Sequence, residues 1–418
     1  MKVLVVGGGG REHALAWSLS RSPRVSKLFC APGNAGIAQI ADCIDIDAND
    51  FDRLVSFAKE VGVDLTVVGP EDPLCNGIVD RFESEGLRVF GPKKDAAEIE
   101  GSKIFSKRLM ARYMIPTATG RPFDECDRAL RFVEGADFPL VIKADGLAAG
   151  KGVTVARSVE EATAALEAAM VDKRFGAAGG SVLIEDYLQG EEASVLAFTD
   201  GKTIAILPSA RDYKRAFDAD EGPNTGGMGS YSPTPACTDA ILDQVVGQIL
   251  VPFVHAMNKE GRTFRGILYT GLMITKGGPK VVEFNCRFGD PEAQAVLMRL
   301  KTDLVDVIDA VLESRLDEIE LEFDPRHACC VVLASKNYPE SSPLGLPISG
   351  LDGIEASDDL QVFHGGTAQR GDEIVTAGGR ILGVTALGDD LAGARKRAYE
   401  AASGIQWEGA RMRSDIGA

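Results

Sequence analysis

Residues 1–92 alternate short apolar runs with amphipathic stretches, and this alternation constrains the fold more than any other feature of the chain. The apolar runs predict strands at Lys2–Val6, Lys27–Ala31, Val63–Val68 and Leu87–Phe90. The amphipathic stretches predict helices at Arg11–Ser20, Phe51–Glu60 and Leu74–Glu85. Because strands and helices alternate, we expect a parallel sheet with helices on both faces.

Beyond a lysine-rich helical stretch near 93–113, the order of predicted elements changes. A hairpin is predicted around Asp200-Gly201, and the segment 208–237 is so rich in Gly, Pro, Ser, Thr and Asp that it predicts a long functional or disordered loop. The other predicted elements are strands at Pro139–Ala144, Gly152–Ala156, Ser181–Asp186, 265–275 and 279–285, and helices at 158–171, 239–260 and 390–403.

The charge balance excludes some classes of partner. Lys plus Arg number 45 and Asp plus Glu number 62, so the formal net charge is −17. A chain this acidic is a poor partner for nucleic acid or an anionic membrane, and phosphate chemistry needs a local basic site or a metal. Eight scattered cysteines without a C-x-x-C pair favour reduced thiols and a cytoplasmic protein. No apolar run approaches the roughly 18 residues of a membrane span.

A first glycine cluster, Gly7–Gly10, directly follows the first predicted strand. It fails the dinucleotide-binding fingerprint, because Glu12 or His13 occupies the third glycine position. The backbone N–H groups of such a junction can still receive an anion. We therefore expect a site for an anion or a small substrate here; a tight turn that needs small residues is the alternative.

A second glycine-rich segment, Gly146–Gly152, follows a strand that ends near Lys143 and carries Lys151. It is no Walker A loop, because three residues separate Gly146 from Gly150 and glycine follows the lysine. Two lysines and a loop of backbone donors favour polyphosphate binding over a flexible surface hairpin.

A third motif runs from the apolar residues 182–184 into the acidic pairs 185–186 and 191–192. It is either a solvated strand end or a connection between two lobes. In the second case, the backbone contacts a purine and a carboxylate accepts hydrogen bonds from ribose hydroxyls.

Glu283 and Asn285 lie two residues apart in a predicted strand, so their side chains share one face. Carboxylate and amide oxygens suit Mg²⁺, which also takes oxygens from substrate phosphates. Arg287 falls on the same side and suits a planar anion such as an acyl phosphate. A polar outer face is the alternative.

The 208–237 segment adds basic residues at 211–215 and glycines at 222–231, which suit a phosphorylated substrate or a mobile linker.

The chain closely resembles the glycinamide ribonucleotide synthetase family of the ATP-grasp superfamily. The resemblance runs nearly end to end, through GGGGREHALAW (7–17), APGNAG (31–36), VGPEDPL (68–74), EGSKIFSK (100–107), VIKADGLAAGKGV (141–153), GEEASV (190–195), GPNTGGMGSYSP (222–233), EFNCRFGDPE (283–292), VFHGGT (362–367) and VTAGGRILGVTALG (375–388).

This resemblance implies an α/β architecture with a Rossmann-like pre-ATP-grasp domain, a two-lobed ATP-grasp domain and a small C-terminal α+β domain. The expected boundaries are 1–102 for the N-terminal domain, 103–192 for lobe A (118–190 forming the small lobe), 193–323 for lobe B and 324–418 for the C-terminal domain.

The implied reaction joins glycine to 5-phosphoribosylamine with ATP and Mg²⁺ or Mn²⁺, through glycyl phosphate, in purine biosynthesis. We expect a monomer. The alternatives are another ATP-grasp carboxylate–amine ligase and a non-catalytic nucleotide-binding regulatory protein.

The resemblance also implies site residues. The metal ligands are Glu283 and Asn285. The catalytic residues are Arg287, Lys143 and Asp212. The ATP site comprises Lys103, Lys143, Gly146, Gly150, Lys151, Gly152, Glu185, Tyr187, Leu188 and Glu192, with Glu191 as the alternative ribose carboxylate. The substrate side comprises Gly9, Gly10, Arg11, Asp212, Lys214, Asn224, Thr225, Gly226, Gly227, Met228, Arg287 and Asp290, with Lys214 expected on the sugar phosphate. The chain departs from many ATP-grasp relatives at 271–274, where the strand before Glu283 lacks an acidic residue.

Overall fold

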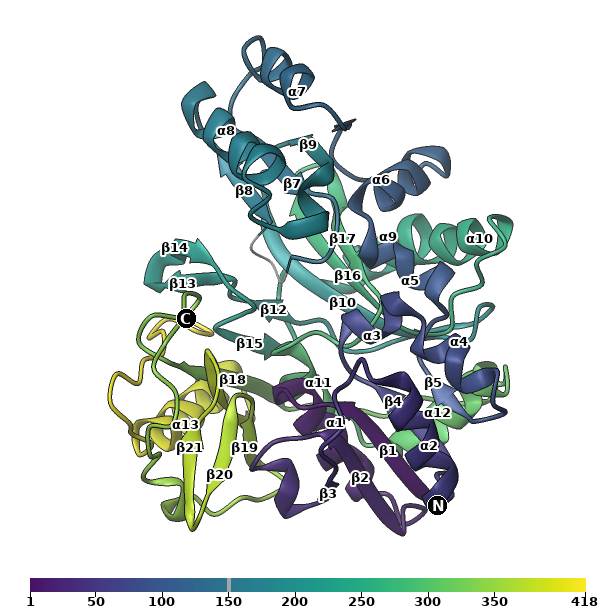
Figure 1. Cartoon of the computed structure of the whole chain (residues 1–418), viewed down its shortest axis with the longest axis vertical. Coiled ribbons are helices and arrows are strands. Elements are labelled where there is room, and N and C mark those ends of the chain that lie inside the picture. The colour runs from purple at the N-terminus through teal and green to yellow at the C-terminus, as the bar shows by residue number, and fades with distance from the viewer. Residues whose placement is uncertain (149–151) are drawn as a thin grey trace.

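The computed structural model describes residues 1–148 and 152–418 (Figure 1). Its N-terminal sheet is parallel, in the order β3-β2-β1-β4-β5. The strands are β1 (Lys2–Gly7), β2 (Lys27–Pro32), β3 (Asp42–Cys43), β4 (Leu65–Val68) and β5 (Val89–Phe90). Leu4 and Val6 pack into one hydrophobic cluster and Val3 and Val5 into another, so both faces of the sheet are buried. The predicted parallel sheet is confirmed.

The helices of this domain are α1 (Gly10–Ser20), α2 (Phe51–Val61), α3 (Glu71–Asn76) and α4 (Ile78–Glu83). The single helix predicted at Leu74–Glu85 is wrong, because two short helices occupy this region. Gly77 separates them with φ of +97°, a left-handed conformation that a helix interior does not contain. The 93–113 stretch likewise forms two helices, α5 (Lys94–Gly101) and α6 (Lys103–Arg112), and the side chain of Ser102 caps the second.

A small antiparallel lobe projects at the top of Figure 1. Its sheet has the order β6-β9-β7-β8, from β6 (Gly120–Phe123), β7 (Leu140–Ala144), β8 (Val153–Ala156) and β9 (Val182–Asp186). Helices α7 (Cys126–Val133) and α8 (Val159–Leu166) pack on it and close a separate hydrophobic core. Ser158 caps α8 as predicted, because its hydroxyl accepts a hydrogen bond from the Glu161 N–H.

A second antiparallel sheet, in the order β11-β10-β16-β17, lies below this lobe. Its strands are β10 (Glu191–Thr199), β11 (Ile204–Ile206), β16 (Gly266–Thr275) and β17 (Gly278–Asn285), and the hairpin predicted at Asp200-Gly201 is confirmed. The helical segment 239–259 comprises α9 (Asp239–Val245), a π-helical turn and α10 (Val251–Lys259). It is long and apolar enough to cross a bilayer, yet Ile249, Phe253 and Met257 belong to the hydrophobic core, as is common for a core helix.

The third sheet, in the order β12-β15-β18-β22-β19, corrects the prediction of an irregular 208–237 loop. Its strands are β12 (Arg211–Asp212), β15 (Gly229–Ser232), β18 (His327–Ala334), β19 (Leu360–His364) and β22 (Arg380–Gly388). Tyr231 pairs with Cys329, nearly a hundred residues away in the sequence, so local periodicity gave no signal for these strands. The third sheet therefore combines strands from both sides of the boundary expected between lobe B and the C-terminal domain at residue 324.

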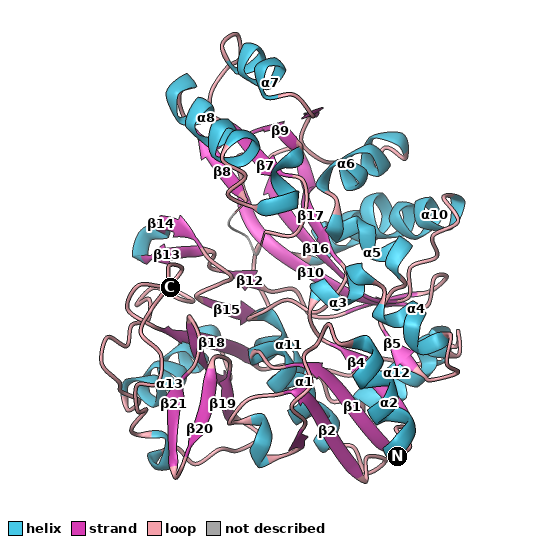
Figure 2. Cartoon of the chain, in the orientation of Figure 1, coloured by secondary structure: helices cyan, strands magenta, loops and turns pink. Residues whose placement is uncertain are grey.

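The remaining elements surround this sheet and its neighbours (Figure 2). Helix α11 (Glu292–Arg299) packs between the N-terminal domain and the third sheet, because it contacts both α1 and β18. These elements are two hairpins, β13 (Arg215–Phe217) with β14 (Glu221–Asn224) and β20 (Thr367–Arg370) with β21 (Glu373–Thr376), and the helices α11 (Glu292–Arg299), α12 (Leu304–Leu312) and α13 (Leu391–Ser403).

Candidate active site

Lys214 forms an ion pair with the carboxylate of Glu283, and the charges of Lys143 and Lys103, from distant segments, act on the same carboxylate. Lys214 Nζ lies 3.1 Å from Glu283 Oε1. The charge of Lys214, with smaller contributions from Lys143 and Lys103, lowers the pKa of Glu283 to about 2 against the opposing effect of burial. Glu283 is therefore ionised at neutral pH. The lysines around it form a locally positive site, although the chain as a whole is acidic.

Lys143, near the end of β7, is held on two sides. Its Nζ lies 2.6 Å from Glu185 Oε2 and donates a hydrogen bond of 2.8 Å to the Val282 carbonyl. Lys107 of α6 lies 2.5 Å from the other oxygen of Glu185. Burial lowers the pKa of Lys107, although Glu185 favours its charged form. Lys107 lies within the EGSKIFSK stretch but was not among the residues predicted for the site.

Lys103 opens α6, and its Nζ donates a 2.8 Å hydrogen bond to the Gly146 carbonyl at the start of the predicted phosphate loop. Burial lowers the pKa of Lys103. The Gly152 carbonyl accepts a 2.8 Å hydrogen bond from Ala144 N, which closes the other end of the loop. The predicted ATP-site residues Gly150 and Lys151 lie outside the described residues.

The rest of the predicted ATP site lies on the chain between the two lobes. Tyr187 and Leu188 follow β9 directly, where the small lobe connects to β10. Tyr187 is exposed, and Glu192 lies on β10. The structure thus places the predicted purine and ribose residues at the junction of the lobes.

Glu283 and Asn285 lie on β17, opposite Gly271 and Tyr269 of β16. The Asn285 side-chain nitrogen donates hydrogen bonds to Glu100 Oε1 (3.0 Å) and to the Phe284 carbonyl (3.2 Å). In this orientation the amide oxygen points away from Glu100. One ionised carboxylate and one amide oxygen fit a hard divalent cation. No group of three His, Cys, Asp or Glu suited to a metal occurs among the described residues, so phosphates and water would complete the coordination.

Arg287 is oriented by two carboxylates. Its Nε lies 3.1 Å from Glu71 Oε2, and its terminal nitrogen lies 2.8 Å from Glu100 Oε1. Arg11 also faces Glu71 at 3.5 Å and contacts Glu12 at 2.6 Å. Burial opposes ionisation of Glu71, but Arg287 and Arg11 lower its pKa to about 2. Both arginines predicted to receive anions are thus already paired, which the sequence pattern did not indicate.

The two glycine loops meet at Asp290. A Cβ added at Gly9 or Gly10 would lie 3.6 Å from an Asp290 carboxylate oxygen. Gly227 lies against the same residue, where a Cβ would stand 3.2 Å from the Asp290 carbonyl. The predicted substrate residues at the two loops therefore lie together in space, across the interface of the N-terminal domain and the third sheet.

Arg380 at the start of β22 connects the Gly226 loop to Asp290, and it was not among the residues predicted from the sequence. It donates hydrogen bonds to the carbonyls of Gly226 (2.6 Å) and Asp290 (2.7 Å), and its other nitrogen lies 3.1 Å from Asp290 Oδ2. Tyr338 accepts a 2.8 Å hydrogen bond from Gly226 N. The VTAGGRILGV stretch, which is part of the family resemblance, contains Arg380 and was the one sequence feature that pointed to it.

Three further residues predicted on the substrate side, Asn224, Thr225 and Met228, make contacts within the protein. Asn224 donates a 3.4 Å hydrogen bond to the Val153 carbonyl, Thr225 donates a 2.8 Å hydrogen bond to the Lys214 carbonyl, and Met228 is fully buried.

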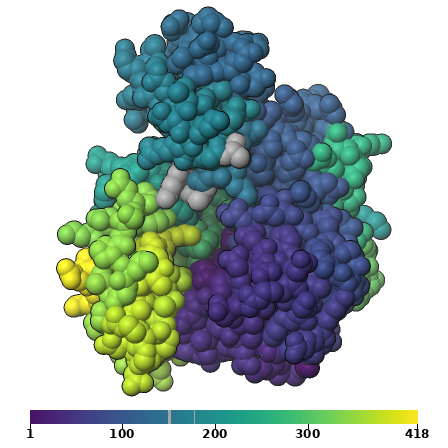
Figure 3. Space-filling model, in the orientation of Figure 1, coloured from purple at the N-terminus to yellow at the C-terminus, as the bar shows by residue number. Residues whose placement is uncertain are grey.

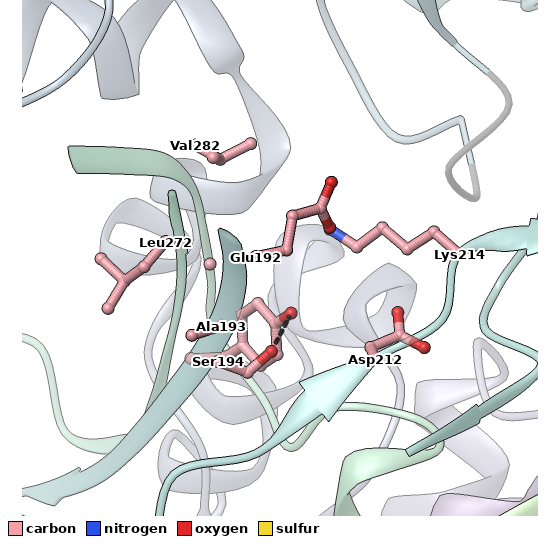
Figure 4. A pocket seen from close by; sticks show the side chains of 9 residues that line it. Glu192, Ala193, Ser194, Asp212, Lys214, Leu272 and Val282 are labelled. Atoms are coloured by element: carbon pink, nitrogen blue, oxygen red, sulfur yellow. Dashed lines mark hydrogen bonds between the residues drawn. The ribbon is translucent and has the colours of Figure 1, made fainter. Parts of the chain in front are cut away.

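A small pocket lies beside Glu283, between β10, β16 and β12 (Figure 4). Ser194 Oγ lies 2.9 Å from the Tyr269 hydroxyl and donates a 3.0 Å hydrogen bond to Glu292 Oε1. Asp212 Oδ1 is buried and has no hydrogen-bond partner among the described residues. Burial raises the pKa of Asp212 well above its usual value, and Glu292 raises it further. The residues lining the pocket are Glu192, Ala193, Ser194, Asp212, Lys214, Tyr269, Gly271, Leu272 and Val282.

Family models cover nearly the whole chain. The phosphoribosylglycinamide synthetase N domain matches residues 1–100, its ATP-grasp (A) domain matches 101–293 and its C domain matches 328–418. The chain belongs to the phosphoribosylglycinamide synthetase family. The resemblance predicted from the motifs and the predicted fold class are thereby confirmed.

Curated relatives agree with this membership of the synthetase family. The chain is 49% identical over 418 residues to phosphoribosylamine–glycine ligase of Caldanaerobacter subterraneus subsp. tengcongensis, with both chains fully covered. It is 52% identical over 417 residues to the ligase of the same name from Halalkalibacterium halodurans, covering 100% of this chain and 96% of the relative. The crystal structure of phosphoribosylamine–glycine ligase from Thermotoga maritima superposes with a TM-score of 0.85 at 32% identity, covering both chains fully.

A more distant structure shares the fold of this synthetase-family chain. The biotin carboxylase domain of Hydrogenobacter thermophilus 2-oxoglutarate carboxylase, solved with MgADP and bicarbonate, superposes with a TM-score of 0.76 at 18% identity. The superposition covers 98% of this chain and 91% of that domain. Figure 3 shows a recess between the small lobe and the N-terminal and C-terminal parts of the chain.

Proposed function

We propose that this chain joins glycine to 5-phosphoribosylamine, using ATP and a glycyl phosphate intermediate, to give glycinamide ribonucleotide, ADP and phosphate. As a member of its family, it is an ATP-dependent carbon–nitrogen ligase of purine biosynthesis. The observation that carries the proposed mechanism is the placement of two lysines at the Glu283 strand: Lys214 Nζ lies 3.1 Å from Glu283 Oε1, and Lys143 Nζ donates a 2.8 Å hydrogen bond to the Val282 carbonyl.

The chemistry explains why such a site is needed. A carboxylate does not react with an amine until one of its oxygens becomes a leaving group. Transfer of the γ-phosphoryl group from ATP to a glycine carboxylate oxygen supplies that leaving group. The amine of phosphoribosylamine then attacks the carbonyl carbon, and phosphate departs with the oxygen that it acquired from glycine. Both steps require positioning and charge neutralisation and need no covalent nucleophile from the protein.

In this proposal Lys103 and Lys143 neutralise the phosphates, and Glu283 and Asn285 hold Mg²⁺ or Mn²⁺ through their oxygens. The metal, when bound, neutralises phosphate charge and orients the γ-phosphoryl group. Arg287, whose guanidinium Glu71 and Glu100 hold in place, contacts the acyl phosphate. The fixed orientation limits the reorganisation that the site undergoes during the reaction.

The adenosine end of ATP occupies the junction of the two lobes in this proposal, near Glu185, Tyr187, Leu188 and Glu192. We also propose that the enzyme works as a monomer in the cytoplasm. The eight cysteines support that compartment, because all of them are free thiols in the structure.

A coupled ADP-release assay with each substrate omitted in turn tests the proposal. We expect ADP to form at a steady rate only with glycine, phosphoribosylamine, ATP and a divalent cation together, and we expect glycinamide ribonucleotide as the product. Sustained turnover with another amine acceptor in place of phosphoribosylamine would favour a different ATP-grasp ligase. The absence of any turnover, despite ATP binding, would favour a regulatory protein.

A further inference from the structure

We infer that the segment 411–417 is a positioning element of the proposed site, because it holds the strand that carries Asp212 and Lys214. The inference rests on the proposed function, since it gives residues outside the pocket a role in substrate binding. Asp212 and Lys214 both line the pocket in Figure 4. Tyr213, between them in the sequence, lies on the opposite face of the strand and belongs to the hydrophobic cluster that contains Ile416.

Arg413 is at the centre of the contacts that this segment makes. Its side chain is 1% exposed, and its Nε and one terminal nitrogen donate hydrogen bonds of 2.7 and 2.6 Å to the two carboxylate oxygens of Asp415. The other terminal nitrogen donates to the Arg215 carbonyl (3.1 Å) and to Asp220 Oδ1 (2.9 Å). The guanidinium carbon lies 4.8 Å from the centre of the Tyr213 ring. One buried guanidinium therefore joins the segment to the start of β13, to the turn after β13 and to the strand beside the pocket.

The turn between β13 and β14 depends on the same segment. Ala219 and Asp220 have φ of +59° and +54°, in the left-handed region that residues other than glycine rarely adopt. Asp415 Oδ2 accepts a 2.9 Å hydrogen bond from the Ala219 N–H, and the Ser414 N–H donates a 2.8 Å hydrogen bond to Asp218 Oδ1. These contacts come from outside the hairpin and stabilise a turn that its own backbone disfavours.

Tyr213 connects this support to the pocket. Its hydroxyl accepts a 3.0 Å hydrogen bond from the Gly417 N–H, and the guanidinium carbon of Arg211 lies 5.1 Å from its ring centre. Its backbone N–H donates to the Gly229 carbonyl (3.0 Å), and its carbonyl accepts a 2.8 Å hydrogen bond from the Met228 N–H. The position of Tyr213 therefore sets the positions of its two neighbours that line the pocket.

Helix α13 holds the segment from the other side. Arg395 donates hydrogen bonds to the carbonyls of Ser414 (2.8 Å) and Ile416 (3.0 Å), and the Tyr399 hydroxyl donates a 2.7 Å hydrogen bond to the Arg413 carbonyl. The helix itself packs on β18 and β22 of the third sheet. The residues proposed for ATP lie on other elements, so loosening the segment should affect the substrate side selectively.

Hydrogen exchange tests the structural part of the inference without any substrate. Arg413→Met keeps an unbranched side chain and removes the hydrogen bonds of the guanidinium. The amides of Tyr213, Thr225 and Met228 donate hydrogen bonds inside the region that the segment holds. We expect these amides to exchange about 10-fold faster in the variant, whereas the amides of β7 and β9 stay as in wild type. Unchanged exchange at 213–228 in a folded Arg413→Met variant would overturn the inference.

Steady-state kinetics test the functional part. A purely structural role would lower the amount of active enzyme, and hence kcat, without changing KM. We expect Arg413→Met instead to raise the KM for glycine and for phosphoribosylamine by on the order of 10-fold, because their binding groups are displaced, and to change the KM for ATP by less than about two-fold. Wild-type KM values for glycine and phosphoribosylamine, or an equal rise for ATP, would overturn the inference.

Arg299→Met is the matched control, because Arg299 is also a buried arginine. It donates hydrogen bonds to the Ser232 hydroxyl and the Asp324 carbonyl, which lie outside 211–220. Its loss should lower the melting temperature and leave the exchange at 213–228 and all KM values unchanged. A rise in the same KM values with Arg299→Met would show that general loosening causes the effect, and would overturn the inference.

If Arg413→Met does not fold, Tyr213→Phe decides, because it removes only the hydroxyl that Gly417 contacts. We expect the same changes in smaller measure, and wild-type exchange together with wild-type KM values would overturn the inference. A wild-type chain without glycine-dependent turnover would contradict the proposed function. Hydrogen exchange would still show in that case whether the segment holds the strand.

Discussion

Lys107 Nζ of α6 lies 2.5 Å from Glu185 Oε1 of β9, in the small lobe, and Lys143 Nζ lies 2.6 Å from the other oxygen of the same carboxylate. Side chains of all three residues are 6–8% exposed. Lys107 also donates hydrogen bonds to the Thr117 hydroxyl and the Ala118 carbonyl. Lys107 therefore connects α6 to the small lobe and fixes the position of Glu185, which in turn orients Lys143 toward the proposed phosphates.

Replacing Lys107 with alanine should destabilise the small lobe, because removal of one partner leaves a buried charge undercompensated. We expect the opening free energy of the β7 and β9 amides to fall by about 3 kcal/mol, with a higher KM for ATP. Hydrogen exchange of these amides measures the first effect. Arg108→Ala, at the exposed neighbouring position, should change neither quantity. Unchanged exchange in Lys107→Ala would show that Glu185 is held by other contacts.

Replacing Glu283 with glutamine should abolish turnover and leave the fold intact. The substitution keeps the shape of the side chain and removes one metal-binding charge, which should raise the barrier by on the order of several kcal/mol. Initial rates of ADP release over a range of Mg²⁺ concentrations, with circular dichroism as the folding check, provide the measurement. Glu221→Gln, exposed on β14, is the control. Near-normal activity of a folded Glu283→Gln variant would exclude the metal role.

Gly227 should not tolerate a side chain. Its φ is +112°, and a Cβ there would stand 2.4 Å from Pro291 Cδ and 2.7 Å from Asp212 Oδ1. We expect Gly227→Ala to displace the substrate loop at a cost of about 1–3 kcal/mol and to raise the KM for phosphoribosylamine and glycine. Steady-state kinetics with each substrate varied provide the measurement. Gly247→Ala, where a Cβ meets open space, should leave both constants unchanged, and equal behaviour of the two variants would contradict the loop assignment.

The ion pairs of Glu71 should make the interface of the N-terminal and ATP-grasp domains sensitive to acid. The pKa of Glu71 falls from about 4.3 in an unfolded chain to about 2 in the fold, so the carboxylate contributes about 3 kcal/mol of stability above pH 5. Because the folded pKa is the lower one, this contribution is lost as the pH falls from about 5 to about 2.

Acid titration followed by circular dichroism measures this effect. We expect Glu71→Gln to be less stable than wild type at neutral pH, and we expect the difference to disappear toward pH 2. A difference in stability that stays constant across this range would contradict an electrostatic role for Glu71.

Local patterns in the sequence predicted the parts of the fold whose partners are near in the chain. The parallel N-terminal sheet, the hairpin at Asp200-Gly201 and the cap at Ser158 each depend on short-range periodicity or turn chemistry. The strands β12 and β15 were missed, because their short sequences become strands only by pairing with each other and with β18.

In the candidate site, too, local patterns predicted some residues, whereas others come together only through the fold. Alternation along β17 placed Glu283 and Asn285 on one face from the sequence alone. Arg380 could not be found in this way, because the carbonyls that it binds lie 90 or more residues away in the sequence. The carboxylates that pair with Arg287 come from α3 and α5, and no local pattern indicates which acidic residue will meet an arginine from another domain.

In the proposed reaction the glycine carboxylate is phosphorylated before the amine attacks, and the fate of its two oxygen atoms tests this order. Glycine labelled with ¹⁸O in both carboxylate oxygens is converted with unlabelled ATP, water and phosphoribosylamine, and the inorganic phosphate is analysed by mass spectrometry. We expect each phosphate to carry a single ¹⁸O atom and glycinamide ribonucleotide to keep the other. Phosphate without ¹⁸O, formed together with glycinamide ribonucleotide, would contradict the glycyl phosphate intermediate.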